Sequence, residues 1–110
     1  RSVPYFHWWP KQNTTEWITY TFPEAKQIQS ATVYWFDDQP WGGCKTPDSW
    51  TIQYKDANGN WQNVENVDSY PIKKGTACTA NFKPVKTSEV KILVKQPAKY
   101  SCGLFEWSVK

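Results

Sequence analysis

The sequence of 110 residues has no methionine, a single histidine and no long apolar run. A membrane-spanning helix needs about 18 or more apolar residues, so none is predicted. Basic residues number 13 against 10 acidic ones, and the lysines are scattered singly rather than gathered in runs. This charge pattern does not favour nucleic acid as a partner. The length suits one domain, and we predict a single module over residues 1–110.

Motifs of common catalytic and metal sites are also absent. The sequence contains no G-x-S-x-G, and its three cysteines form no CxxC pair. His7 has no second histidine to help it bind a metal. Asp37 and Asp38 are consecutive, so in a strand they would diverge, whereas glycosidase carboxylates lie about 5 to 9.5 Å apart across a cleft. We therefore predict no enzymatic activity and no catalytic cofactor.

The chain begins at Arg1 and carries no signal-peptide pattern. Because it opens within an aromatic stretch rather than at a methionine, we expect it to be a piece of a longer polypeptide. A missing leader therefore says nothing about secretion.

Aromatic residues are plentiful, with eight tryptophans and six tyrosines. The stretch "YFHWWP" at residues 5–10 places Trp8 beside Trp9. Neighbouring side chains of an extended chain point to opposite faces, so we expect one of the two indoles to be buried and the other exposed.

Alternating apolar and polar residues predict several short strands, most clearly at residues 16–22, 28–36, 49–55 and 88–96. In the last of these, Val90, Ile92 and Val94 are predicted to face inward. Asn58-Gly59 offers a left-handed pair that suits a tight hairpin. Helical periodicity is absent, and the eight prolines fall at loop-like places between the segments. The pattern predicts an all-β chain of about seven strands, packed as an antiparallel β-sandwich of two sheets.

Successive strands of discoidin domains are resembled by the segments "TEWITYTFPEAKQIQSATVYWF", "TPDSWTIQYKDANGNWQNV" and "ANFKPVKTSEVKILVKQ" followed by "GLFEWSV". These are coagulation factor 5/8 type C domains with a galactose-binding-like jelly roll, a group that includes family 32 carbohydrate-binding modules. The resemblance covers nearly all of the chain from Thr15 onward. More narrowly, "PYFHWWPKQNTTEW" and "YWFDDQPWGGCKTPDSW" resemble the C-terminal accessory region of bacterial β-L-arabinofuranosidase-type enzymes. This resemblance implies a secreted, periplasmic or cell-surface bacterial protein with an adjacent catalytic domain.

Members of this family begin with a further strand and a loop that binds a structural calcium ion, and this sequence lacks both. The resemblance implies that Glu106 is the calcium-contacting acidic residue near the final strand. Without the early loop, calcium binding at Glu106 stays open.

The resemblance also implies that ligands meet the loops at one end of the sandwich, here residues 5–11, 37–45 and 99–102. A sugar offers an apolar face and a rim of hydroxyls, so it needs aromatic planes and hydrogen-bonding groups. The candidate planes and polar groups are Trp8, Trp9, Trp41, Tyr100, His7, Asp37, Asp38 and Lys45. Trp41 is the preferred platform, because Gly42 and Gly43 leave it uncovered. His7 could bind a hydroxyl or fasten its own loop, and Trp17, Trp50, Trp61 and Trp107 are assigned to structure.

Two of the predicted loops contain Cys44 and Cys102, one in each. Either these cysteines form a disulfide, which would close a loop of about 58 residues and join two binding loops, or both are reduced and buried. Cys78, on a strand flanked by small residues, is expected to be free.

These features favour a non-catalytic carbohydrate-binding module that holds a glycoside hydrolase on a plant or host glycan. A purely structural domain, packed on the catalytic domain through its aromatics, is one alternative. Adsorption to a phospholipid surface through loop tryptophans is another, although the lysines do not cluster beside Trp8, Trp9 or Trp41.

Overall fold

The computed structural model describes residues 6–7, 15–36, 46–73, 76–96 and 103–110. These residues form β1 (Phe6–His7), β2 (Thr15–Phe36), β3 (Ser49–Lys55), β4 (Trp61–Asn63), β5 (Cys78–Lys95) and β6 (Gly103–Val109). All pairings are antiparallel, in the order β1-β6-β2-β5-β3-β4. The described residues contain no helix, which confirms the predicted all-β class. Accordingly, no helix among them could span a membrane.

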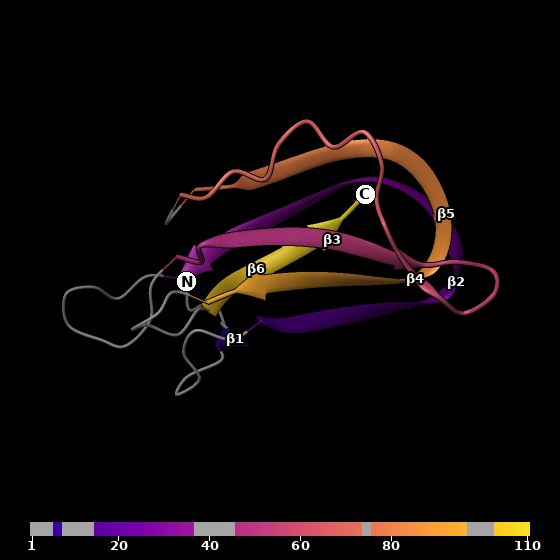
Figure 1. Cartoon of the computed structure of the whole chain (residues 1–110), viewed down its shortest axis with the longest axis horizontal. Helices are drawn as coiled ribbons and strands as arrows, with labels where there is room; N and C mark the ends of the chain where they lie inside the picture. The colour runs from indigo at the N-terminus through magenta and orange to yellow at the C-terminus, as the bar shows by residue number, and fades with distance from the viewer. Residues whose placement is uncertain (1–5, 8–14, 37–45, 74–75, 97–102) are drawn as a thin grey trace.

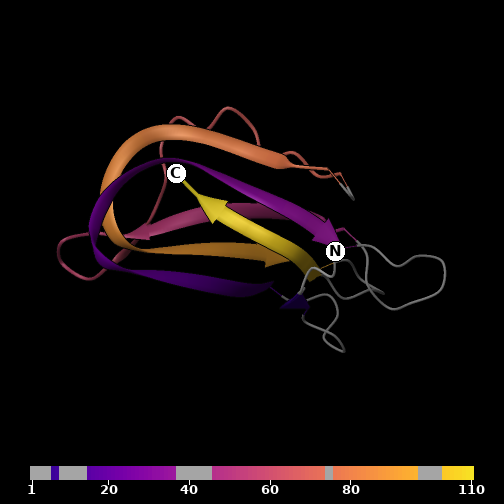
Figure 2. The same cartoon turned by 180° about the vertical axis from the view of Figure 1, so that it is seen from behind.

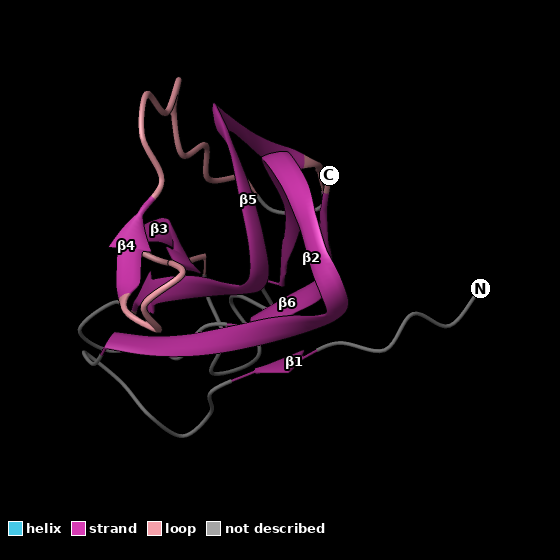
Figure 3. Cartoon of the chain, turned by 90° about the vertical axis from the view of Figure 1, so that its right-hand side faces the viewer, coloured by secondary structure: helices cyan, strands magenta, loops and turns pink. Residues whose placement is uncertain are grey.

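Two long strands fold this sheet over on itself. The first half of β2 pairs with the second half of β5, while its second half pairs with the start of β5 and with β6. Figure 1 shows β2 and β5 curving together at the right-hand end of the molecule. In the side view of Figure 3 the same two strands turn the corner from one layer to the other. The predicted sandwich is confirmed, and its two layers are parts of one hydrogen-bonded sheet.

The prediction of loops at Pro23 and Pro84 was wrong, because both prolines lie inside these continuous strands. The ladder between β2 and β5 shifts register between Thr21 and Lys26, and again between Ile28 and Ser30. Pro23 lies within the first shift, and Pro84 lies among the residues of β5 that the second shift leaves without a β2 partner. Proline has no N–H to donate, so it is tolerated where the ladder is interrupted, and such irregularities bend a strand.

The core lies between the two layers. Val90, Ile92 and Val94 are fully buried, as their alternation predicts. The rings of Trp35 and Trp50 pack edge to face, with 5.6 Å between their centroids. Other buried apolar residues of the core are Ile28, Ala31, Val33, Ile52, Val64, Cys78, Ala80 and Phe82. Cys78 is a free cysteine, as predicted.

The hairpin between β3 and β4 differs in detail from its prediction. Among its described residues only Gly59 has a positive φ, of 83°, so Asn58 is not left-handed. The Gly59 N–H donates to the Asp56 carbonyl at 3.0 Å. The Asp56 N–H in turn donates to the Asn60 carbonyl at 2.8 Å. This arrangement, a turn over residues 56–59 whose fourth residue is the left-handed glycine, is a common three-residue hairpin loop.

Candidate functional site

The ends of several strands meet at one end of the folded sheet. In the ladder His7 and Phe36 both stand opposite Gly103, while Thr15 and Ser49 both stand opposite Lys95. Figure 1 shows these strand ends together at the left of the molecule, and Figure 2 shows them from behind at the right. Each predicted binding segment adjoins one of these ends in the sequence, since residues 8–11 follow His7, residues 37–45 follow Phe36 and residues 99–102 precede Gly103.

The side chains predicted to bind ligand lie outside the described residues: Trp8, Trp9, Asp37, Asp38, Trp41, Lys45 and Tyr100. The same holds for Cys44 and Cys102. His7 and Glu106 are placed by their backbones, in β1 and in β6 opposite Tyr34. Their roles, including calcium binding at Glu106, stay predictions. Within the described part of the chain, no three metal-ligating side chains gather in a cluster.

Three aromatic side chains pack together in the interior near this end of the sheet, those of Trp35, Trp50 and Tyr70. Trp35 directly precedes Phe36 and is fully buried, and no described residue accepts a hydrogen bond from its Nε1. The Trp50 indole donates to the Pro71 carbonyl at 2.9 Å and meets the Tyr70 ring edge-on. The Tyr70 hydroxyl accepts from the Ile52 N–H at 3.1 Å, and burial raises the pKa of Tyr70 more than this bond lowers it. Such packing holds the strand ends in place before any ligand arrives.

The assignment of Trp17 to structure was wrong. Its side chain is 56% exposed, and it points away from the core on the outer face of the layer formed by the first half of β2, the second half of β5, β3 and β4. The sequence does carry a signal for this position, because Trp17 shares its side of the strand with Thr19 and Thr21. Trp50 is buried as assigned, Trp61 is half-buried, and the Trp107 side chain lies outside the described residues.

Lysine side chains lie over the rings of this outer face. The Lys91 ammonium is 5.7 Å from the Trp17 ring centroid and 4.1 Å from that of Trp61. Lys55 approaches Trp61 as well, at 5.1 Å, and forms an ion pair with Glu89. Cation–π contacts of this kind hold an ammonium group at a fixed place on a surface.

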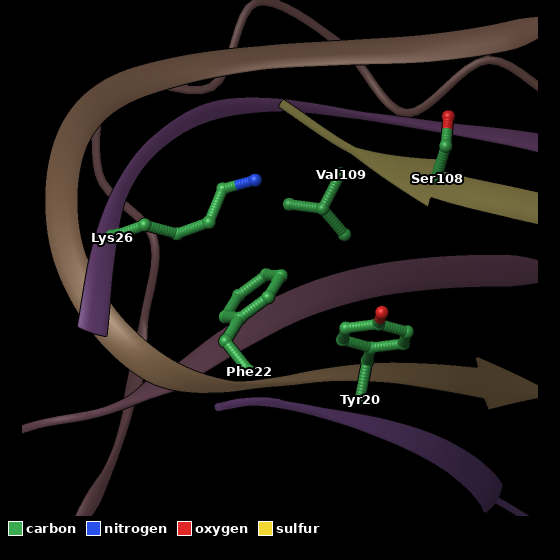
Figure 4. A pocket seen from close by; sticks show the side chains of 5 residues that line it. All are labelled: Tyr20, Phe22, Lys26, Ser108 and Val109. Carbon is green, nitrogen blue, oxygen red and sulfur yellow. The ribbon is translucent and has the colours of Figure 1, made fainter. Parts of the chain in front are cut away.

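A separate hollow of about 260 Å³ lies between the two layers, lined by Tyr20, Phe22, Lys26, Ser108 and Val109. Figure 4 shows the rings of Phe22 and Tyr20 side by side, facing the Val109 side chain of β6. The Lys26 ammonium lies 5.0 Å from the Phe22 ring centroid, so that ring is partly covered. Its lining combines two aromatic rings with the Tyr20 hydroxyl, the Lys26 ammonium and the Ser108 hydroxyl, and it contains none of the residues predicted to bind a sugar.

Two aspartates have lowered pKa values, and both fasten loops. Backbone and side-chain donors hold the pKa of Asp56 below its ordinary value, chiefly the Asn60 N–H at 2.9 Å. For Asp68, the largest cause of the lowered pKa is the Asn81 side-chain amide, at 2.9 Å. A general acid needs a raised pKa, so neither carboxyl is a candidate for that role.

The sequence of NedA-like, galactose-binding domains of the F5/F8 type C class matches residues 5–92, most of the chain. The chain belongs to the F5/8 type C family. This confirms the resemblance drawn from the strand segments. The narrower likeness to β-L-arabinofuranosidase accessory regions stays a prediction.

Solved structures share the fold of this F5/8 type C domain. A structure of Streptococcus pneumoniae beta-galactosidase BgaA matches 96% of this chain and 74% of its own, with 16% identity and a TM-score of 0.82. Chitosan-binding module 1 from a Paenibacillus sp. IK-5 chitosanase/glucanase covers 87% and 68%, with 18% identity and a TM-score of 0.64. A pectin-binding carbohydrate-binding module covers 86% and 65%, with 14% identity and a TM-score of 0.58. At these identities the matches show the galactose-binding-like fold alone.

Proposed function

We propose that this F5/8 type C domain is a non-catalytic carbohydrate-binding module whose site lies at the end of the sheet where His7, Phe36 and Gly103 meet. The observation that carries the proposal is this meeting of strand ends, each next to a segment rich in aromatic or polar side chains. Membership of a galactose-binding-like family supports it.

The chemistry of the adjoining segments fits a sugar. Trp41, with Trp8, Trp9 or Tyr100, supplies a flat apolar surface for the C–H face of the ring. His7, Asp37, Asp38 and Lys45 supply donors and acceptors for the hydroxyls. A shallow site of this kind binds weakly, with a Kd of about 1 mM, because few of its polar contacts are fully desolvated.

We further propose that the domain is attached to a glycoside hydrolase in a secreted or cell-surface bacterial protein. The structural neighbours from a beta-galactosidase and from a chitosanase/glucanase support this arrangement. Attachment would make weak binding useful, since it raises the concentration of glycan near the active site.

Affinity gel electrophoresis of the 110-residue chain tests the site. Neutral plant and host polysaccharides are cast into native gels, and the migration of the wild type is compared with that of Trp41→Ala and Trp8→Ala. We expect at least one polysaccharide to retard the wild type and Trp41→Ala to reduce the retardation roughly tenfold, as expected for loss of a stacking platform.

Trp17→Ala is the matched control with the neutral polysaccharides, because it removes an exposed indole from the outer face of the sheet and not from the three strand-end segments. Equal retardation of the wild type and Trp41→Ala would place the binding surface elsewhere. Retardation by none of the polysaccharides would contradict the proposal, and binding to phosphatidylserine vesicles instead would favour a membrane role.

A further inference from the structure

The outer lysine face consists of six side chains on the outside of one layer: Trp17, Lys55, Trp61, Glu89, Lys91 and Lys95. We propose that this face is a second glycan-binding surface and that it takes acidic polysaccharides, with uronate carboxylates as the recognised groups. This face lies outside the three strand-end segments, although its Lys95 stands at the same end of the sheet, and the inference does not depend on the strand-end site.

Trp17 provides the stacking surface. It lies in β2, opposite Leu93 of β5, and more than half of its side chain is in contact with solvent. An indole this exposed contributes little to the core, and the part of it that faces solvent offers a flat apolar surface on which a pyranose ring can stack.

Lys91 is already positioned for an anion. Its ammonium is held between two indoles, at 5.7 Å from the Trp17 centroid and 4.1 Å from the Trp61 centroid. Ordering a lysine on binding costs conformational entropy, and this lysine has already lost part of that freedom in the unbound protein. A carboxylate next to the sugar stacked on Trp17 would therefore meet an ammonium group at a defined position.

The charge of the face complements an acidic polymer. Glu89 is the one acidic side chain of the set and is paired with Lys55. Lys91 and Lys95 form no ion pair with any carboxylate among the described residues. By strand alternation Lys95 points to the same side as Lys91, so two positive charges follow one another along β5. Two such charges attract a polymer that carries a carboxylate on successive sugars.

The surroundings favour a polysaccharide over a membrane. Lipid adsorption needs aromatic residues that protrude into the headgroup region. Trp17 instead lies within a strand, among neighbours on the same face such as Thr19 and Gln53. The Gln53 amide donates to Asn63 at 3.0 Å, so a network of polar groups borders the rings and can bind hydroxyls. A flat face with rings, charges and amides suits an extended sugar chain.

Affinity electrophoresis against polygalacturonate tests the inference with the same 110-residue chain. We expect the wild type to be retarded, and the retardation to fall roughly five- to tenfold in both Trp17→Ala and Lys91→Gln, the size of one stacking or charge contact. Lys91→Arg should keep most of the binding, because arginine retains the charge and stacks on aromatic rings. Raising the salt concentration should weaken the wild-type retardation.

Two controls separate this surface from other causes. Lys110→Gln removes an exposed lysine from the other layer and should leave the retardation unchanged; a loss equal to that of Lys91→Gln would mean attraction by net charge alone. Trp41→Ala should keep binding to polygalacturonate even if it loses the neutral polysaccharides, so the two proposed sites can fail independently. Absence of retardation, or equal retardation of Trp17→Ala and wild type, would overturn the inference, as would binding to anionic vesicles alone.

Discussion

At the scale of single residues, Trp50 and Trp17 show how the face of a strand decides what an indole does. Both lie in the same layer, but Trp50 is 1% exposed and points between the layers, whereas Trp17 is 56% exposed and points outward. The Trp50 ring meets Trp35 and Tyr70, and its N–H is bonded to a carbonyl. The Trp17 ring contacts the Lys91 ammonium group and is otherwise exposed to solvent. The first indole stabilises the fold, and the second is available to a ligand.

We predict that Trp50→Phe lowers the free energy of unfolding by about 2 to 3 kcal/mol. The smaller ring leaves a cavity beside Trp35, and the Pro71 carbonyl loses its buried donor. Urea denaturation followed by far-ultraviolet circular dichroism measures the change.

Trp17→Phe serves as the control for this measurement and should change the free energy of unfolding by no more than about 0.5 kcal/mol. If both substitutions lower the free energy of unfolding by the same amount, burial of the Trp50 indole does not stabilise the fold as proposed.

At the scale of elements, the β3–β4 hairpin is organised by the carboxylate of Asp56. Its Oδ1 accepts from the N–H groups of Asn58 and Asn60, both at 2.9 Å. Its Oδ2 accepts from the Gln62 amide at 3.1 Å. These bonds favour the ionised form and keep the pKa of Asp56 in the folded protein below its ordinary value of 3.8.

It follows that the hairpin is weakened by acid. With a folded-state pKa below the unfolded one, the stabilisation from Asp56 is complete above the unfolded pKa and is lost as the pH falls through the folded pKa. We expect Asp56→Asn to make the urea midpoint less sensitive to pH between about pH 6 and about pH 2.

Asp68 has a lowered pKa for a similar reason, so Asp68→Asn should flatten the same profile. Asp48 shows no comparable set of donors among the described residues, and Asp48→Asn is the control. An acid dependence identical in wild type and Asp56→Asn would show that the turn bonds do not persist in solution.

The elements also show what the sequence could and could not predict. The alternation of apolar and polar residues was enough to predict that Val90, Ile92 and Val94 are buried, because it depends only on which face of a strand is exposed to solvent. The sequence could not predict that β2 continues through Pro23 and that β5 continues through Pro84. Whether a proline ends a strand depends on whether its missing N–H faces a partner, and that is decided by the register between β2 and β5.

At the scale of the whole molecule, the bend in β2 and β5 explains where the proposed site lies. Because both strands turn back, β2 starts and ends at the same end of the molecule, and β5 finishes there as well. The β3–β4 turn lies at the opposite end, since β3 starts beside the end of β5 and runs away from it. Aromatic segments far apart in the sequence can thereby adjoin one surface.

The candidate site was predictable only in part for the same reason. The family resemblance implied which segments bind ligand, and the strand ends next to those segments in the sequence, at His7, Phe36 and Gly103, lie together; the binding role of the segments stays a prediction. The outer lysine face was not foreseen, because Trp17, Trp61 and Lys91 come from three strands and meet only through the ladder.

The most direct test of the central claim is a map of backbone amide signals of the nitrogen-15-labelled chain, titrated with an oligosaccharide of whichever neutral glycan retards it. We predict that the amide signals of His7, Phe36 and Gly103 shift together with increasing sugar, while those of Gly59 and Asn60 at the far end stay in place. Shifts confined to the hairpin end, or spread evenly over the sheet, would contradict it.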